Sequence, residues 1–581
     1  MSKKNAKPLP WAFLDAYRGT KFNGEWPTLP EMFEITVERY GKRACFTDFE
    51  GPGGSKNTLT YDEAYQKIIN LAKWMNENGV KKGSHVAVSG KNSPEWAIVY
   101  LAALFAGATI TPLDYGLHES ELDNLLNTAE PVLFFVDSEK YEYFAGKKNK
   151  YKVYSLSPKF AETYVYSLTA SDKAVLNEDK VTEDDVAAIL FTSGTTGTPK
   201  GVMLTHKNLV SDCYIAQNHM DIFHTDVFYA LLPIHHAYTM LAVFIETISQ
   251  GAEVVFGKTM AVSKMLKELR EGKITMLLGV PLLFNKLLEG IMKGIRAKGI
   301  VVYGIIRFLM GISYFMKKVF KVNVGKKMFK AILDKASIGS LRVAICGGGP
   351  LASSVFKKYQ EFGLDFVQGY GLTETSPIIA LNPIEHFKIE SVGAFFEGYM
   401  DMRIADPDED EVGEVQVKGP MVMKGYYNMP EETAKVFTED GWFKTGDLGR
   451  MDSEGYLILC GRAKNMIVTE GGKNVYPEEI ENAFQLVNEI EQITVTGFIE
   501  DKAKKSEKIE ALIYPSDYAY QKVSGTRGNA SDDAKVKELV SNEVEKINKK
   551  QASYAKIAKI TILEKPLEMT TTKKVKRVYN K

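Results

Sequence analysis

The segment with the clearest chemical potential is residues 187–202, AAILFTSGTTGTPKGV, in which an apolar strand-like run ends in hydroxyls, glycines and a lysine. Glycine tolerates positive φ, so successive backbone N–H groups can surround an anion, and Lys200 adds a positive charge. The spacing is not that of a Walker loop. A solvated surface loop is the alternative for such a cluster. We expect a phosphate-binding loop formed by Thr192, Ser193, Gly194, Thr195, Thr196, Gly197, Thr198 and Lys200.

Three further motifs lie C-terminal to this loop. GGGPL begins at Gly347 after the strand-like run LRVAICG, and glycines at a strand end let the backbone approach a flat ligand. QGYGLTET carries Glu374, a hard oxygen ligand; Mg²⁺ often takes only one or two carboxylates together with phosphate oxygens. TGDLG offers the carboxylate of Asp447, and Gly461 and Arg462 follow. Taken alone, Glu374 would more often be a surface residue.

In this order the motifs resemble those of the adenylate-forming (AMP-binding) enzymes, which include acyl-CoA synthetases, aryl-CoA ligases, amino-acid adenylation domains and beetle luciferases. The resemblance covers roughly residues 30–581. It implies ATP and coenzyme A as substrates and Mg²⁺ as the cofactor. It implies that Tyr370 stacks on the adenine, Thr373 contacts the α-phosphate and Glu374 holds Mg²⁺, with Asp447 and Arg462 at the ribose. The other implied nucleotide-binding residues are Gly347, Gly348, Gly349, Pro350, Gln368, Gly369 and Gly371.

The same resemblance extends into the C-terminal part of the chain. Lys464 falls on the family's hinge position, and Gly471, Gly472 and Lys473 match the loop that borders the thiol tunnel. The tail PLEMTTTKKVKR resembles the family's ending, and its alignment puts the catalytic lysine at Lys574. Lysine stands at 573 where glycine is usual, so Lys573 is the alternative. A solvated basic tail is the common fate of a lysine run.

A histidine pair, His235 and His236, lies in LPIHHAYT. Paired histidines often bind metal, but no third ligand stands at a suitable spacing. The resemblance places His236 at the junction of the acyl and thiol tunnels, and a structural histidine is the alternative.

These assignments define a two-step reaction. Attack of a carboxylate on the α-phosphorus of ATP expels pyrophosphate and leaves an acyl-adenylate; a thiol then displaces AMP. The first step needs positioning and charge stabilisation rather than a side-chain nucleophile. The resemblance implies that the C-terminal domain turns about Lys464 between the steps, withdrawing Lys574 and presenting the glycine loop.

The acid is predicted to be apolar. Amino-acid adenylation domains carry an aspartate after the histidine region, whereas here Glu246 is the only acid between His235 and Gln250. The strings MLLGVPLLFNKLLEGI and GGKNVYPEEIE and a long insert at about residues 292–337 most resemble bacterial long-chain fatty acyl-CoA synthetases. We therefore expect a medium- to long-chain fatty acid–CoA ligase. The alternatives are loading of an acyl-carrier protein, an aryl-CoA ligase, a luciferase-like oxygenase or a non-catalytic nucleotide-binding relative.

The insert is apolar over residues 299–316 except for Arg307, and a central arginine costs about 2.5–3.5 kcal/mol on insertion scales, so we do not expect a span. Residues 299–330 could form a basic amphipathic helix on a membrane surface. The alternative is a helix packed on the core with a solvated basic face.

Composition bounds the remaining possibilities. The 581 residues carry 73 basic and 73 acidic side chains, so nucleic acid is disfavoured as a partner. Four scattered cysteines indicate a reducing compartment, and the N-terminus lacks a secretory h-region, so we expect a cytoplasmic protein, with peripheral contact at the inner membrane face as an option.

The motifs must be positioned by a large α/β scaffold. Helical and strand patterns alternate early in the chain, as at residues 60–78 and 85–89, which predicts largely parallel sheets. The resemblance implies two stacked α/β subdomains plus a small β-barrel-like subdomain. We expect an N-terminal domain over residues 1–461, with its β-rich part at about 389–460. A hinge at 462–465 and a mobile α+β C-terminal domain at 466–581 complete the prediction.

Overall fold

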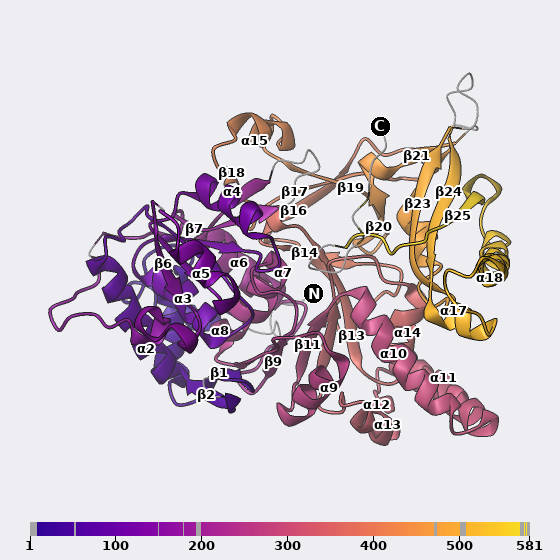
Figure 1. Cartoon of the computed structure of the whole chain (residues 1–581), viewed down its shortest axis with the longest axis horizontal. Helices are drawn as coiled ribbons and strands as arrows, with labels where there is room; N and C mark the ends of the chain where they lie inside the picture. Colours follow the sequence, from indigo (N-terminus) through magenta and orange to yellow (C-terminus); the bar gives the residue numbers. More distant parts are fainter. Residues whose placement is uncertain are drawn as a thin grey trace, which may run out of the picture.

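The computed structural model describes residues 9–51, 54–148, 150–177, 179–192, 199–469, 473–499, 507–569, 575 and 577. Two large sheets form the N-terminal part, and a smaller sheet with its own helices forms the C-terminal part (Figure 1). This is the α/β architecture that the sequence predicts.

The seven-stranded sheet is mainly parallel and carries the start of the predicted phosphate loop. The five neighbouring strands β6, β5, β3, β4 and β7 run parallel. The hairpin from β7 to β8 and the pairing of β8 with β18 are antiparallel. The strand order is β18 (Gly425–Tyr426), β8 (Lys200–Thr205), β7 (Val186–Thr192), β4 (Thr109–Leu113), β3 (His85–Ser89), β5 (Leu133–Val136) and β6 (Lys152–Ser155).

The thirteen-stranded sheet changes character along its width. Its six middle strands, in the spatial order β1, β10, β9, β11, β12 and β13, are parallel. The strands that follow β13 in space, namely β14, β15, β20, β19, β17 and β16, are antiparallel. The predicted β-rich region therefore continues a parallel sheet. The order is β16 (Asp401–Ala405), β17 (Gly413–Lys418), β19 (Phe443–Met451), β20 (Tyr456–Arg462), β15 (Gly393–Phe395), β14 (Ile378–Leu381), β13 (Asp365–Gly371), β12 (Val343–Cys346), β11 (Met276–Gly279), β9 (Val227–Ala230), β10 (Glu253–Phe256), β1 (Ala44–Asp48) and β2 (Asn57–Thr60).

Local sequence signals set several helix ends. Thr60 caps the helix at Tyr61–Glu77 by accepting from the Glu63 backbone while the Glu63 side chain returns to Thr60, a reciprocal pair that stabilises a helix start. The helix at Pro94–Phe105 is buried on nearly every side, which explains its continuous apolar sequence. The helices up to the insert are α1 (Leu29–Tyr40), α2 (Tyr61–Glu77), α3 (Pro94–Phe105), α4 (Glu119–Ala129), α5 (Ser138–Ala145), α6 (His206–Ala216), α7 (Ala237–Thr239), α8 (Glu246–Gln250) and α9 (Val262–Glu271).

The insert is helical but broken. Helix α11 ends at Phe320 and Lys321 adopts a left-handed conformation, so residues 299–330 do not form the single basic helix that the sequence suggested. Gly325 lies against Ser313 and Gly363, where a Cβ would meet atoms at 2.2 and 2.8 Å, so a side chain at this position would not fit. The helices of the N-terminal part from the insert onwards are α10 (Pro281–Arg296), α11 (Ile300–Phe320), α12 (Gly325–Met328), α13 (Lys330–Lys335), α14 (Ser353–Glu361) and α15 (Pro430–Val436).

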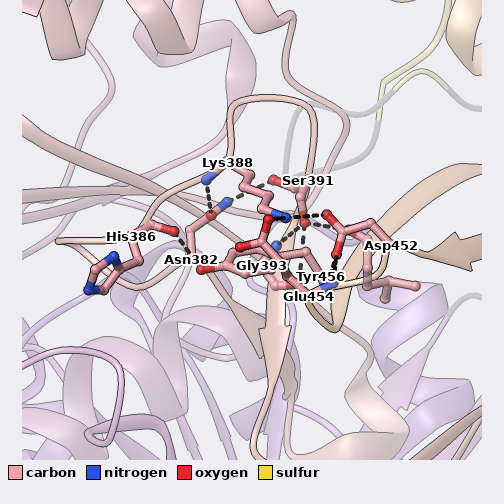
Figure 2. Close-up of polar contacts among 9 residues, drawn as sticks. Asn382, His386, Lys388, Ser391, Gly393, Asp452, Glu454 and Tyr456 are labelled. Carbon is pink, nitrogen blue, oxygen red and sulfur yellow. Dashed lines mark hydrogen bonds and ion pairs between the residues drawn. The ribbon is translucent and has the colours of Figure 1, made fainter. Parts of the chain in front are cut away.

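A polar network braces the loop between β14 and β15 (Figure 2). Asn382 donates to the Ser391 carbonyl at 2.7 Å and accepts from the Lys388 backbone at 2.9 Å. The Lys388 ammonium pairs with Asp452 and Glu454 in the turn after β19. Because this loop also carries Ile389 and Val392, the network fixes part of the cavity wall described below.

The C-terminal part has a hydrophobic core of its own, built from residues between Ile467 and Ile557. Its three-stranded sheet pairs β23 with β24 antiparallel and β24 with β25 parallel. Its elements are β21 (Ile467–Val468), β22 (Asn474–Val475), α16 (Pro477–Asn482), β23 (Ile490–Phe498), β24 (Lys508–Pro515), α17 (Asp517–Lys522), α18 (Ala530–Asn548) and β25 (Ile557–Ile562).

Candidate active site

One cavity of about 2090 Å³ gathers most of the predicted site residues that the structure describes. It lies where the two large sheets and the C-terminal part meet, and residues from all three line it. The predicted residues on its wall are Thr192, Lys200, His236, Gly347, Gly348, Gly349, Pro350, Gln368, Gly369, Tyr370, Gly371, Thr373, Glu374, Asp447, Arg462 and Lys464.

The Asp447 carboxylate is held from two sides. Tyr370 donates to Oδ2 at 2.7 Å, and the Arg462 Nε lies 2.9 Å from Oδ1. Asp447 and Arg462 are register partners on β19 and β20, and Tyr370 stands on β13 of the same sheet, which explains how distant motifs meet. Burial and the neighbouring Asp447 charge raise the pKa of Tyr370, so its phenol stays protonated and donates.

Glu374 and Lys200 are joined through a residue that sequence motifs did not reveal. Tyr426 donates to Glu374 Oε1 at 2.9 Å, and the Lys200 ammonium lies 4.9 Å from the Tyr426 ring centre. Lys200 also pairs with Glu432 at 2.6 Å, and this contact lowers the pKa of Glu432 to about 2. A phosphate bound by Lys200 would therefore compete with the Glu432 carboxylate.

The donor set fits a magnesium ion that is shared with phosphates. Among the described residues, no group of three or more His, Cys, Asp or Glu could hold a metal ion. Glu374 instead offers a single carboxylate on the cavity wall, at the short helix Thr373–Thr375. Mg²⁺ is commonly bound in this way, by one or two carboxylates together with substrate oxygens and water.

Tyr238 occupies the space beside the glycine motif. A Cβ on Gly347 would lie 2.9 Å from the Tyr238 ring, and the phenol donates to the Ile345 carbonyl at 3.1 Å. The bare backbone of Gly347 is therefore required by a protein side chain, not only by a flat ligand as the motif suggested. Gly349 remains open on that side, with its nearest neighbour, Pro281, at 3.7 Å.

The side chains of the two adjacent histidines have different partners. His236 begins α7, accepts from the Tyr238 backbone at 3.3 Å and faces the cavity. His235 lies 3.6 Å from Asp114, and burial lowers its pKa, so it is neutral near pH 7. The pair therefore does not act as a joint metal site in the described structure.

Glu246 is the one acid in the helical segment that follows the histidines. It begins α8 directly after a π-helical turn at Met240–Ile245, and its side chain is 2% exposed. Neither carboxylate oxygen has a hydrogen-bond partner at normal geometry, although the Cys213 thiol and the Gln217 amide partly offset the effect of burial on its pKa. Burial raises its pKa to about 8, so the group is mostly uncharged at pH 7.

The C-terminal part closes the cavity with residues of α16, of the segment that follows α16, and of the tail. Gln485 accepts from the Ala352 backbone at 2.9 Å and donates to the Pro350 carbonyl at 2.8 Å, which ties it to the glycine motif. Met569 and Val575 form an isolated antiparallel bridge and both line the cavity. Arg577 Nη2 donates to both oxygens of the Glu481 carboxylate, at 2.7 and 2.8 Å.

Several predicted residues lie outside the described part of the chain. They are Ser193, Gly194, Thr195, Thr196, Gly197, Thr198, Gly471, Gly472, Lys573 and Lys574. Their roles stay predictions. Lys473 is described and exposed, and its backbone carbonyl accepts from Thr469, outside the cavity wall.

The family model for AMP-binding enzymes matches residues 33–427. The chain belongs to this family. It is therefore an adenylate-forming enzyme that uses ATP, as the motifs indicated.

Curated relatives of this AMP-binding enzyme are similar over most of its length. A long-chain-fatty-acid–[acyl-carrier-protein] ligase, AEE15 of Arabidopsis thaliana, is 28% identical, covering 96% of this chain and 85% of its own. A feruloyl-CoA synthase of Amycolatopsis is 30% identical over 79% and 84% of the two chains. A long-chain-fatty-acid–CoA ligase of Bacillus subtilis is 28% identical over 76% and 78%.

The solved structures agree on the fold. The crystal structure of ATP-bound MatB from Rhodopseudomonas palustris has a TM-score of 0.72 and 25% identity, and it covers 94% of this chain and 97% of its own. The AMP-binding enzyme thus shares the complete arrangement of a large N-terminal and a small C-terminal domain.

Three cavity residues of this AMP-binding enzyme, Tyr238, Tyr426 and Gln485, were not foreseen, and neither was Glu432, which pairs with the cavity residue Lys200. Each acts through a partner far away in the sequence, as Tyr426 does with Glu374. Tyr426 reaches its place because β18 pairs with β8, and no local sequence pattern encodes that pairing.

Proposed function

We propose that this enzyme activates a medium- to long-chain fatty acid through an acyl-adenylate and transfers the acyl group to coenzyme A, releasing AMP and pyrophosphate. The observation that carries the proposal is the cavity itself, which joins the nucleotide motifs to an apolar wall. That wall includes Ala216, Met220, Ala242, Leu278 and Leu381, and its acid, Glu246, has a pKa raised to about 8 by burial.

An uncharged wall favours an apolar acid over an amino acid. A substrate ammonium needs an ionised partner, because an unpaired charge is costly to bury. Glu246 keeps its proton near pH 7 and its oxygens are covered, so it supplies no such partner.

In the first step a carboxylate oxygen of the acid attacks the α-phosphorus, and the bond to the β-phosphate oxygen breaks. Asp447 and Tyr370 would hold the ribose and the adenine, while Thr373 and Lys200 contact the phosphates. Glu374 would hold Mg²⁺, which neutralises charge on the phosphate oxygens when bound. Lys574 would bridge the carboxylate and the α-phosphate, a task that suits a flexible point charge.

In the second step the thiol sulfur attacks the acyl carbonyl carbon, the bond to the AMP oxygen breaks, and the thiol proton passes to solvent. We assign the hinge to Lys464 and the thiol tunnel to Gly471, Gly472 and Lys473. His236 would stand where the acyl and thiol tunnels meet.

We place the enzyme in the cytoplasm, with residues 299–330 in peripheral contact with the inner membrane face. The exposed apolar surface of α11 supports this location.

The test is a substrate panel with two acceptors. AMP and the thioester product would be measured for saturated fatty acids of increasing length, for ferulate and for benzoate, with coenzyme A or a phosphopantetheinylated acyl-carrier protein. The proposal expects acyl-CoA as the product and the highest kcat/KM with longer fatty acids. A preference for aryl acids, or product on the carrier protein alone, would replace it.

A further inference from the structure

Helix α11 presents apolar side chains to solvent along its whole length. Among the described helices it alone has the length and composition of a membrane-crossing segment, and little of it is buried. In Figure 1 its end projects beyond the rest of the fold at the lower right. Six of the exposed residues follow a spacing of four and three, which confines these six to an arc of about 80° and a length of about 27 Å; Ile300, Val302 and Phe320 are exposed beside them. This stripe consists of Val301, Ile305, Phe308, Ile312, Phe315 and Val319.

The opposite side of α11 is fixed to the protein. Met310 and Ser313 are fully buried there. Lys317 pairs with Asp365 at 2.8 Å and donates to the Leu364 carbonyl at 3.0 Å, and Arg307 pairs with Glu361 at 3.0 Å. Because these contacts anchor the inner face, α11 cannot leave the domain to cross a bilayer, and only the stripe remains available.

The surroundings of the stripe carry a strong positive charge. Residues 290–333 contain ten lysines and arginines and no acidic residue, although the whole chain is neutral. Exposed cations lie near both ends of the stripe: Lys293, Arg296 and Lys298 before its first residue, Lys318 next to its last residue, and Lys321 and Lys327 after it.

We propose that the stripe docks on the surface of an anionic lipid bilayer, with α11 lying in the plane of the interface. An apolar helix face buries itself at the boundary of headgroups and acyl chains, and flanking cations bind anionic headgroups. An exposed apolar patch of this kind marks an interaction site. The charge decides between lipid and a second copy of the chain, because two such surfaces face to face would repel each other.

Docking would serve the proposed ligase by bringing the cavity to the phase that holds long-chain fatty acids. The docking itself does not depend on the ligase proposal, since binding can be measured without turnover.

The experiment uses flotation of the purified full-length protein with phosphatidylcholine vesicles, with or without phosphatidylglycerol. Phe308 and Phe315 are 70% and 55% exposed, so the double variant Phe308→Gln, Phe315→Gln removes apolar surface without disturbing the core. Val175→Gln is the matched control, because Val175 is 71% exposed in a distant loop. A third variant, Lys298→Gln, Lys318→Gln, removes two exposed cations.

We expect the wild type and Val175→Gln to bind the anionic vesicles, less so as salt is raised. The double phenylalanine variant should bind at least about tenfold more weakly, and the lysine variant should lose affinity for anionic vesicles only. Equal binding by the phenylalanine variant, or no binding by the wild type, overturns the proposal. So does a lipid-free wild-type dimer that becomes monomeric in the phenylalanine variant, because the stripe would then be a self-association surface.

Discussion

Replacing Glu246 by glutamine should remove a pH-dependent cost from the folded state. In the unfolded chain this carboxyl ionises near its ordinary value of 4.5, whereas burial raises its pKa to about 8 in the folded protein. The stability gained from its proton is complete below pH 4.5 and is lost as the pH rises toward 8. Glutamine has almost the same shape and does not titrate in this range.

The magnitude follows from the two pKa values. One pH unit across this window is worth about 1.4 kcal/mol, so wild-type stability should fall relative to the variant by roughly 2–3 kcal/mol between pH 5 and pH 7. Asp212, a second buried carboxyl whose pKa is raised by burial, is present in both proteins, so its own contribution largely cancels. A constant effect of the new amide also cancels, because only the change with pH is compared.

The assay is urea unfolding followed by tryptophan fluorescence at several pH values. The dependence of the free energy of unfolding on urea concentration should have the same slope in every measurement. Glu162→Gln is the control, because Glu162 is exposed. Its free energy of unfolding should run parallel to the wild type. If the free energy of unfolding of Glu246→Gln also runs parallel to that of the wild type, the Glu246 carboxyl is ionised in the folded protein. The proposal that this part of the cavity wall is uncharged would then be wrong.

Three further predictions concern the nucleotide site. Asp447→Asn removes the charge held by Arg462 and Tyr370, so the KM for ATP in AMP formation should rise about 10- to 100-fold, while Asp401→Asn, at an exposed position outside the cavity wall, should leave it unchanged; an unchanged KM in Asp447→Asn would contradict the ribose assignment. Glu374→Gln should raise the Mg²⁺ concentration for half-maximal AMP formation about tenfold, and chelation should abolish wild-type activity; identical Mg²⁺ titrations would remove Glu374 as the ligand. Lys574→Ala should lower adenylate formation about 100- to 1000-fold and Lys573→Ala little; the reverse result would shift the tail alignment by one residue.

Much of the scaffold could be predicted because its signals are local. The cap at Thr60 and the strand His85–Ser89 depend on residues within one element, and the structure has both. The motifs around Gly347, Glu374 and Asp447 were recognisable because each is a short continuous string. Their convergence on one cavity agrees with the family assignment.

The remainder depends on contacts between distant residues. Lys200 was expected to bind phosphate, but in the structure it pairs with Glu432. Glu432 lies on α15, and no sequence motif indicates that this helix contacts the phosphate loop. Residues 299–330 were predicted as one amphipathic helix, yet α11 ends at Phe320, where Lys321 adopts a left-handed conformation, and Gly325 begins a separate short helix packed against Gly363. For α11 the sequence showed its apolar and basic character, but only the tertiary contacts of Lys317 and Arg307 show which face is left exposed.

The central claim is that the carboxylate of a fatty acid attacks the α-phosphorus of ATP. A long-chain fatty acid whose carboxyl oxygens carry a heavy isotope would be turned over with ATP and coenzyme A, and AMP, pyrophosphate and acyl-CoA would be analysed by mass spectrometry. The account predicts one heavy oxygen in AMP and none in pyrophosphate. Unlabelled AMP, or label in a product containing the β-phosphate, would contradict it.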